Sequence, residues 1–307
     1  MTKSKIISFI NMKGGVGKTT LCINVADYLA NKDNKVLILD MDPQFNATQA
    51  LLLEQQRRNR GENENNLDKE STDKKEDEAV KAEIDSSKYY KNLSTRGKTI
   101  LQIFKSTNPN DDKKSIILHF TDNIDFIPGD LDLSSVVAGD TAGKVGAIKQ
   151  YIYNNDLNEH YDYILIDCPP TWSILTHASL YASNYYIIPS KIDFYSSIGI
   201  KSLQDKIKEK LLNEFSYREV AQATGESIEN LGVIFSMTTN LKAESSIKET
   251  VKKDIGKNIP IFDAEIPFIR SAASSFIFYS EVEDNTTYAN LTNSFDQFMS
   301  LLLDKMK

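Results

Sequence analysis

A glycine-rich segment close to the N-terminus combines the residue types that bind phosphate. Residues 9–20 read FINMKGGVGKTT and stand between a predicted strand and a predicted helix. The three glycines allow backbone N–H groups to turn inward around phosphate oxygens, and the following helix adds the positive end of its dipole. This context predicts a phosphate-binding loop. The residues expected to bind the nucleotide in this loop are Lys13, Gly14, Gly15, Val16, Gly17, Lys18, Thr19 and Thr20.

Three side chains at the end of the loop have distinct predicted roles. Lys18 is expected to reach the β- and γ-phosphates of a nucleotide, and the Thr19 hydroxyl is expected to bind Mg²⁺. Thr20 is close enough in sequence to help bind the α-phosphate. A glycine-rich turn that only capped a helix would not need a lysine and two threonines here, so a nucleotide site is the favoured interpretation.

The loop departs from the usual phosphate-binding pattern at its first position. The pattern G-x-x-x-x-G-K-[ST] requires glycine where this chain has Met12, and a second lysine, Lys13, follows it. The run KGGVGKTT resembles the deviant Walker A box of the ParA/MinD superfamily of P-loop ATPases, and of its ParA/Soj branch in particular. In that family the early lysine reaches across a two-fold interface to the ATP of the partner subunit. The resemblance implies that Lys13 acts in trans in an ATP-dependent homodimer; a plain surface lysine is the alternative.

Two acidic segments follow in the order that the same family shows. Residues 39–48, LDMDPQFNAT, resemble its switch I, in which the second aspartate, here Asp42, organises the Mg²⁺ shell and the attacking water. Residues 163–170, YILIDCPP, resemble its Walker B and switch II segment, with Asp167 toward the metal. Each aspartate alone could be a turn former or a helix cap. The family usually has glycine where this chain has Phe45. The resemblance assigns catalysis to Lys13, Lys18 and Asp42, and metal binding to Thr19, Asp42 and Asp167.

Looser matches continue along the chain. Residues 231–237 resemble the strand that the family places near the adenine, and residues 265–267 resemble its late Ile-Pro motif. Met237 and Pro267 are therefore implied adenine contacts, which completes a site for ATP and Mg²⁺. Hydrolysis at such a site depends on holding the γ-phosphoryl group in line with water. Since no strong general base is evident in the motifs, slow intrinsic turnover that a partner stimulates is expected.

The elements that must position these residues follow an alternating pattern. Short apolar runs alternate with segments of helical periodicity, which is typical of a parallel sheet with crossover helices. We predict a single doubly wound α/β domain over residues 1–307. Carboxylates at the ends of its strands would face the crevice in which such sheets bind ligands. The predicted strands cover residues 5–11, 35–40, 123–127, 163–167, 185–189, 231–236 and 259–263.

Residues 54–99 interrupt this pattern. The stretch 54–87 is crowded with charged residues and asparagine, and its apolar residues, such as Val80 and Ile84, are scattered. It offers too little apolar surface to offset its ordering entropy as a core element. We expect a charged surface insertion, either a long polar helix or a flexible loop. Its nearly balanced charges make it a poor candidate for a nucleic-acid-binding tail.

The composition limits the possible functions. A formal net charge of −7 at pH 7 argues against a chain whose main task is to coat DNA. The longest apolar runs are too short to span a membrane, and no secretory signal is visible. Two cysteines cannot form a disulfide framework, and their scarcity fits a reducing cytosol. A cytoplasmic location without membrane contact is expected, and the resemblance to the ParA/Soj branch implies association with the nucleoid.

The resembled family binds DNA without sequence preference through basic residues on C-terminal helices. Such a patch binds phosphates by counterion release and weakens steeply with salt. The alternative is that the matching lysines are only the solvated faces of amphipathic helices. By position, Lys210 and Lys252 are the nearest matches, and Lys248 and Lys253 are neighbours that the resemblance also implies in DNA contact.

Two classes of function follow from the resemblance. The first is a partition ATPase that segregates plasmid or chromosomal DNA with a ParB-like centromere-binding adaptor. The second is an ATP-switched scaffold that positions protein cargo, or a MinD-like membrane positioner, without DNA binding. The C-terminal segment, residues 293–307, is amphipathic, but its charges nearly balance, so a core helix is favoured over a membrane anchor.

Overall fold

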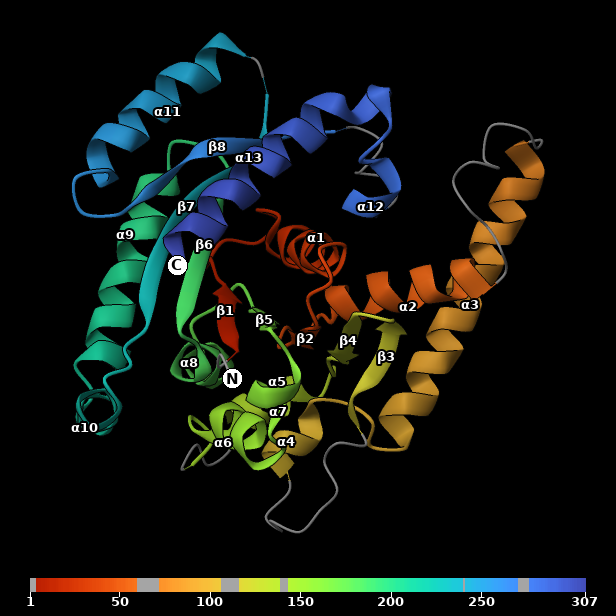
Figure 1. Ribbon diagram of the computed structural model, residues 1–307, viewed down its shortest axis with the longest axis horizontal. Coiled ribbons are helices and arrows are strands. Elements are labelled where there is room, and N and C mark those ends of the chain that lie inside the picture. The colour runs from red at the N-terminus through yellow and green to blue at the C-terminus, as the bar shows by residue number, and fades with distance from the viewer. Residues whose placement is uncertain (1–3, 60–71, 106–115, 139–142, 240, 270–275) are drawn as a thin grey trace.

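An eight-stranded β-sheet forms the centre of the molecule (Figure 1). The computed structural model describes residues 4–59, 72–105, 116–138, 143–239, 241–269 and 276–307. The strand order is β3-β4-β2-β5-β1-β6-β7-β8. The strands are β1 (Lys5–Phe9), β2 (Val36–Asp40), β3 (Leu118–Thr121), β4 (Ile124–Ile127), β5 (Tyr163–Asp167), β6 (Tyr185–Ser190), β7 (Glu229–Thr238) and β8 (Ile261–Pro267).

All neighbouring strands run parallel except β3 and β4, which are antiparallel. This arrangement confirms the predicted doubly wound, mostly parallel α/β architecture. Strands β2 and β5 are buried along their whole length and read as continuous apolar runs that end in aspartate. Such runs are expected for strands that helices cover on both faces.

The predicted strands differ from the structure at the two edges of the sheet. None of the predicted strands corresponds to β3. It has only four residues, of which one is buried, so it lacks an apolar run. Its extended form depends on antiparallel pairing with β4. The sequence predicts the last strand at residues 259–263, but β8 continues to Pro267. Its pairing with β7, in which Thr238 lies opposite Pro267, extends it beyond the apolar run.

Helices cover both faces of the sheet, and each face has its own core. Alternate strand residues point to opposite faces: Val36 and Ile38 of β2 join one core, whereas Leu37 and Leu39 join the other. The first face carries α1 (Lys18–Ala30), α2 (Asn46–Asn59), α3 (Thr72–Thr95), α12 (Tyr279–Val282) and α13 (Ala289–Lys305), and the short helix η5 (Thr286–Tyr288) precedes α13. The second face carries α4 (Leu101–Lys105), α5 (Leu133–Ala138), α6 (Ala147–Asn154), α7 (Leu157–His160), α8 (Ile174–Ala182), α9 (Ser196–Ile207), η3 (Lys208–Leu212), α10 (Phe215–Thr224) and α11 (Lys242–Ile255).

The C-terminal helix α13 is a core helix, as its sequence predicts. Phe295, Phe298, Met299 and Leu302 are buried, and the helix packs along β8. None of the helices in the described part of the chain is long and apolar enough to cross a membrane.

The charged segment 54–99 is mostly helical where the structure describes it, and residues 96–99 form a turn after the last helix. Residues 54–59 end α2, residues 72–95 form α3, and residues 60–71 lie outside the described residues. The two helices pack together beside the β3–β4 edge of the sheet (Figure 1, orange). The segment is not wholly peripheral, because Ala82 is buried and Leu93 joins the core.

The motifs meet at one edge of the sheet. Strands β2, β5 and β1 are adjacent in that order, with Asp40 level with Asp167 and Asp167 level with Phe9. The carboxyl ends of adjacent parallel strands lie side by side. The loops that follow these three strands therefore converge, as the sequence predicts.

Candidate nucleotide-binding site

The glycine-rich loop joins β1 to α1 and is anchored at both ends. Asn11 donates through Nδ2 to the Pro189 carbonyl oxygen at 2.8 Å, and its Oδ1 accepts the Lys13 N–H at 3.0 Å. At the other end, the Ser236 hydroxyl donates to the Val16 carbonyl oxygen at 2.6 Å. These bonds tie the loop to β6 and β7.

Two glycines take backbone conformations that other residues rarely adopt. Gly15 has φ +64° and Gly17, the N-cap of α1, has φ +80°. Positive φ is readily available to glycine alone. This conformation turns the loop into the first turn of α1, whose free N–H groups favour an anion.

Lys18 is buried at the start of α1. Its ammonium group donates to the Lys13 carbonyl oxygen at 3.3 Å, across the loop. Burial lowers the pKa of Lys18, while the charges of Asp167 and Asp42 oppose that shift. The structure therefore brings Lys18 and both predicted aspartates into one electrostatic group.

Asp167 ends β5 and faces α1. Its Oδ2 accepts the Thr19 hydroxyl at 2.6 Å, whereas Oδ1 is buried and has no hydrogen-bond partner among the described residues. Burial and then the nearby Asp40 carboxylate raise its pKa well above the usual range. A buried carboxylate oxygen without a partner is uncommon in proteins and indicates a place for a ligand.

Asp40 is the main residue of the site that the sequence does not assign. Its Oδ2 accepts both the backbone N–H and the hydroxyl of Thr48, at 2.8 and 2.7 Å, and its Oδ1 accepts the Asp42 N–H at 3.2 Å. Burial raises the pKa of Asp40 to about 7. Asp40 thus holds the loop that carries Asp42. The sequence feature that could have indicated Asp40 is its place as the first aspartate of LDMD, residues 39–42.

Asp42 is buried beside the phosphate loop. Its Oδ1 accepts the Gln44 N–H at 2.9 Å. Burial raises the pKa of Asp42, and the Lys18 ammonium group opposes this shift. In the described ranges, no group of three or more His, Cys, Asp and Glu side chains is arranged to hold a metal ion by itself.

Phe45 takes a backbone conformation that favours glycine, the residue that the resemblance implies at this position. Its φ is +42°, in the left-handed region that favours glycine. Its ring stacks on Tyr90 of α3, with ring centroids 4.3 Å apart and planes 6° from parallel. The unusual residue and the inserted helix therefore contact each other.

An apolar pocket of about 150 Å³ lies beside the loop, between α1, β7, β8 and α13. Gly17, Thr20, Met237 and Pro267 all line it, so the structure brings the two implied adenine contacts to the phosphate loop. Asn24, which the sequence does not single out, also lines the pocket. The size and apolar lining fit a flat aromatic base.

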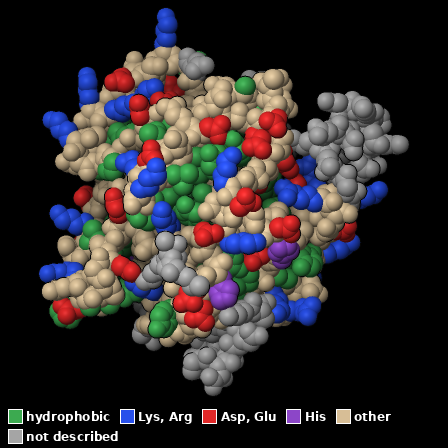
Figure 2. Space-filling view, viewed as in Figure 1, with side chains coloured by type: hydrophobic (Ala, Val, Ile, Leu, Met, Phe, Trp, Pro, Cys, Tyr) green, Lys and Arg blue, Asp and Glu red, His purple; other side chains and the backbone are tan. Residues whose placement is uncertain are grey.

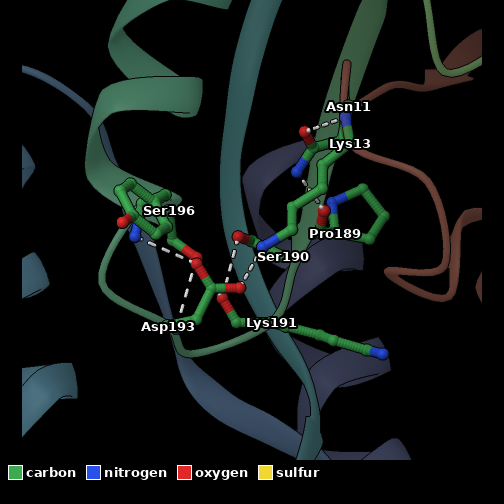
Figure 3. A network of polar contacts seen from close by, with 8 residues as sticks. Asn11, Lys13, Pro189, Ser190, Lys191, Asp193 and Ser196 are labelled. Carbon is green, nitrogen blue, oxygen red and sulfur yellow. Dashed lines mark hydrogen bonds and ion pairs between the residues drawn. The ribbon is translucent and has the colours of Figure 1, made fainter.

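Lys13 points away from the loop and pairs with Asp193, between β6 and α9 (Figure 3). Burial would raise the pKa of Asp193, but its hydrogen bond and ion pair with Lys13 lower it. The Lys13 side chain is 45% exposed. No local pattern in the sequence indicates this pair, since its members are 180 residues apart.

Two of the four lysines implied in DNA contact are paired with carboxylates. Lys210 in η3 has its Nζ 2.7 Å from Glu209 Oε1, and Lys248 has its Nζ 2.7 Å from Glu265 Oε1. Their charges are therefore partly offset within the chain.

The other two, Lys252 and Lys253, line an open hollow at the C-terminal end of α11. Asp254 pairs there with Lys201, so this end of α11 lies beside the first half of α9. Lys210 lies nine residues after Lys201, which is roughly 13 Å further along the helical axis. The four lysines thus do not form one cluster, and basic and acidic side chains are interspersed on the face seen in Figure 2.

Comparison with known proteins places this site in a family. Residues 4–219 match the family model described as AAA domain. The sporulation initiation inhibitor protein Soj of Bacillus subtilis is 29% identical over 206 residues, which cover 66% of this chain and 65% of Soj. The chromosome partitioning protein ParA of Caulobacter vibrioides is 26% identical over 267 residues, which cover 86% of this chain and 80% of that protein. The chain spans 63% to 65% of the length of several curated relatives that it matches, Soj among them.

A solved structure supports the fold over the whole chain. A plasmid partition protein of Borrelia burgdorferi, crystallised with AMPPNP, is 21% identical, covers 99% of each chain and has a TM-score of 0.65. The AAA domain model covers more than half of the chain. The KGGVGKTT loop of the chain matches the deviant Walker A pattern. The chain therefore belongs to the AAA domain family, as a member of the ParA/Soj type.

Proposed function

We propose that this chain binds ATP with Mg²⁺ and hydrolyses it as a partition ATPase. The observation that carries the proposal is the assembly of Lys18, Thr19 and Asp167 in and beside the glycine-rich loop. The lysine supplies positive charge for phosphates, while the hydroxyl and the carboxylate supply oxygen ligands. Asp167 Oδ1, buried and without a partner among the described residues, fits an oxygen ligand for a cation.

Thr19, Asp42 and Asp167 would hold Mg²⁺. The ion usually takes one or two carboxylates and completes its shell with phosphate oxygens and water, so this donor set fits it. When bound, Mg²⁺ would offset charge on the phosphates. The raised pKa values of Asp42 and Asp167 fit this role, since both carboxylates are buried in a site that a cation would stabilise.

The residues of this chain would act mainly by positioning. The loop amides and Lys18 would hold the triphosphate, and the pocket beside Met237 and Pro267 would hold the adenine. Asp42 would orient the attacking water. Because this chemistry uses placement rather than a strong base, intrinsic turnover is expected to be slow and to rise when a partner completes the site.

The surface around Lys13 supports ATP-dependent dimerisation. Phe194, Tyr195 and Ile198, at the start of α9, are 77%, 74% and 63% exposed. Phe194 and Tyr195 follow Asp193 directly and Ile198 comes three residues later, so exposed apolar side chains flank the residue that pairs with Lys13. An exposed cluster of aromatic and aliphatic side chains is typical of a protein interface. In the proposed dimer, Lys13 leaves Asp193 and contacts the ATP of the partner subunit.

Non-specific DNA binding and a ParB-like adaptor complete the proposal. The hollow lined by Lys252 and Lys253 is the better candidate for phosphate contact, because Lys210 and Lys248 are paired with carboxylates. The ParA protein of Caulobacter vibrioides, a chromosome partitioning protein by name, is one sequence relative that supports this role.

A scaffold that positions protein cargo without DNA is the second candidate. The carboxylate partners of Lys210 and Lys248 and the net charge of −7 favour it, because both weaken attraction to phosphate backbones. In this case ATP serves only as a switch between monomer and dimer.

The first experiment tests the nucleotide site. Wild type, Lys18→Ala and Lys13→Ala are compared for ATP binding by calorimetry, for phosphate release, and for mass by light scattering. Lys18→Ala should lose ATP binding, whereas Lys13→Ala should bind ATP as a monomer and form no dimer. Normal ATP binding by Lys18→Ala, or normal dimers of Lys13→Ala, would contradict the proposed roles.

The second experiment separates the two candidate functions. Retention on random-sequence DNA is measured with ATP at increasing salt, for wild type and for Lys252→Glu/Lys253→Glu. A partition ATPase should bind at low salt and lose affinity steeply as salt rises, and the variant should bind weakly throughout. Absence of wild-type retention even at low salt would favour the scaffold.

A further inference from the structure

We propose that Tyr90 of the inserted helix α3 is a positioning residue for Asp42, acting through Phe45. The inference rests on the proposed ATPase function and adds to it a role for residues 72–95. Its basis is a chain of contacts that runs from α3 to the aspartate loop.

The first contact is the ring stack. Phe45 and Tyr90 lie 4.3 Å apart between centroids, with planes 6° from parallel. Phe45 is 9% exposed, although it stands in a loop. Aromatic pairs in offset stacks attract one another beyond their simple burial.

The second contact joins Phe45 to Asp42. The Phe45 N–H donates to the Asp42 carbonyl oxygen at 2.8 Å, and the Phe45 carbonyl oxygen accepts the Gln49 N–H at 3.0 Å. Phe45 therefore closes the turn that carries Asp42 and also supports the first turn of α2. A shift of Phe45 would move the Asp42 backbone with it.

Gly129 lies close to the Cβ atom of Phe45. A Cβ atom at Gly129 would lie 2.9 Å from Asp40 Cγ and 2.9 Å from Phe45 Cβ, so the backbone there is in close contact with both residues. Gly129 also donates its N–H to the Thr48 hydroxyl at 2.7 Å. Phe45 thus contacts Tyr90 through its ring and lies close to Gly129 at its Cβ.

Tyr90 is itself anchored to the segment after β4. Its hydroxyl accepts the Leu131 N–H at 3.4 Å, and Asp130 Oδ2 accepts the Thr99 hydroxyl at 2.5 Å. Tyr90 and Thr99 are therefore both hydrogen-bonded to residues 130–131, and these bonds hold the Tyr90 ring beside the loop that carries Asp42.

The conformation of Phe45 makes this support necessary. A non-glycine residue at φ +42° is in an unfavourable region and keeps it only when its surroundings hold it. A glycine would need no support. Here the Phe45 ring stacks on Tyr90, and this contact stabilises the unfavourable backbone conformation. With glycine at position 45 the loop would adopt this conformation unaided, whereas with phenylalanine the conformation depends on α3.

The test compares Tyr90→Ala and Tyr90→Phe with Tyr89→Ala, a matched control on the same helix whose side chain is 39% exposed. Tyr90→Ala should lower kcat for ATP hydrolysis about 10- to 100-fold, because a small displacement of a positioned group has such effects. Its affinity for ATP should be unchanged, since the phosphate loop and the base pocket do not contact Tyr90. Tyr90→Phe, which keeps the stack, should retain most activity, and Tyr89→Ala all of it.

Two further readouts separate positioning from general stability. In a Phe45→Gly background, Tyr90→Ala should have no additional effect, because the pair acts as a unit. Hydrogen exchange at residues 42–46 should rise in Tyr90→Ala and not in Tyr89→Ala, whether or not ATP is hydrolysed. A wild-type kcat in Tyr90→Ala, or unchanged exchange at residues 42–46, would overturn the inference. Wild-type protein that hydrolyses no ATP would instead overturn the proposed function, and the exchange measurement would still decide the role of Tyr90.

Discussion

Lys13 forms an ion pair with Asp193 of its own chain, across the start of the glycine-rich loop (Figure 3). The Asp193 carboxylate also accepts the Tyr195 N–H through Oδ1 at 3.1 Å, so the loop after β6 presents it to the lysine. In the proposed dimer the same lysine is needed at the ATP of the partner subunit. The intramolecular pair would therefore compete with the proposed dimerisation.

Replacing Asp193 by asparagine should favour the dimer. The amide keeps an oxygen for the Tyr195 N–H but loses the charge that holds Lys13. Exposed pairs contribute about 0.2–1 kcal/mol, so the ATP concentration at half-dimerisation should fall by up to about fivefold. Sedimentation across an ATP titration measures this, with Asp193→Asn/Lys13→Ala as the control that forms no dimer. An unchanged or higher midpoint would show that the pair does not compete.

Gly129→Ala should destabilise the chain. The added Cβ would lie 2.9 Å from Asp40 Cγ and from Phe45 Cβ, in a place with no room for it. Overpacking of this kind costs about 1–3 kcal/mol. Urea unfolding followed by circular dichroism measures the change. Gly199→Ala in α9 is the control, because nothing lies within 4 Å of its added Cβ; equal stability of the two variants would contradict the steric argument.

Leu291→Trp should weaken ATP binding by filling the base pocket. The loss of base burial is expected to reduce affinity at least about tenfold, equivalent to roughly 1.4 kcal/mol. Inorganic tripolyphosphate, which needs only the glycine-rich loop and Lys18, should bind as tightly as to wild type. Calorimetry with both ligands checks this, and a parallel loss of tripolyphosphate binding would indicate general damage to the site.

Acid should destabilise the chain partly through His177. Burial lowers the pKa of His177, although Glu214, 3.3 Å away, opposes the shift. The unfolded histidine, with a pKa near 6.5, then takes up a proton before the folded one does. This contribution to stability is present above about pH 6.5 and is lost as the pH falls through the lowered folded value. The free energy of unfolding, measured from pH 7.5 to 5, should fall more steeply in wild type than in His177→Gln; identical slopes would exclude this contribution.

Much of the fold and the site follows from local patterns in this chain. The buried strands β1, β2 and β5 are apolar runs because helices cover both of their faces. Aspartates at the ends of β2 and β5 meet the glycine-rich loop because the carboxyl ends of parallel neighbours lie together. β3 and the end of β8 were harder to predict, since their extended form depends on pairing with a neighbouring strand.

By itself, the sequence determined which residues can bind phosphate and which strands bring them together, because backbone freedom at glycine and burial in a parallel sheet are local properties. The tertiary structure alone decided that Lys13 pairs with Asp193, that Asp167 keeps a buried oxygen without a described partner, and that Tyr90 stacks on Phe45. Each of these relationships joins residues far apart in the chain. Their geometry depends on how complete elements pack, and no local spacing encodes it.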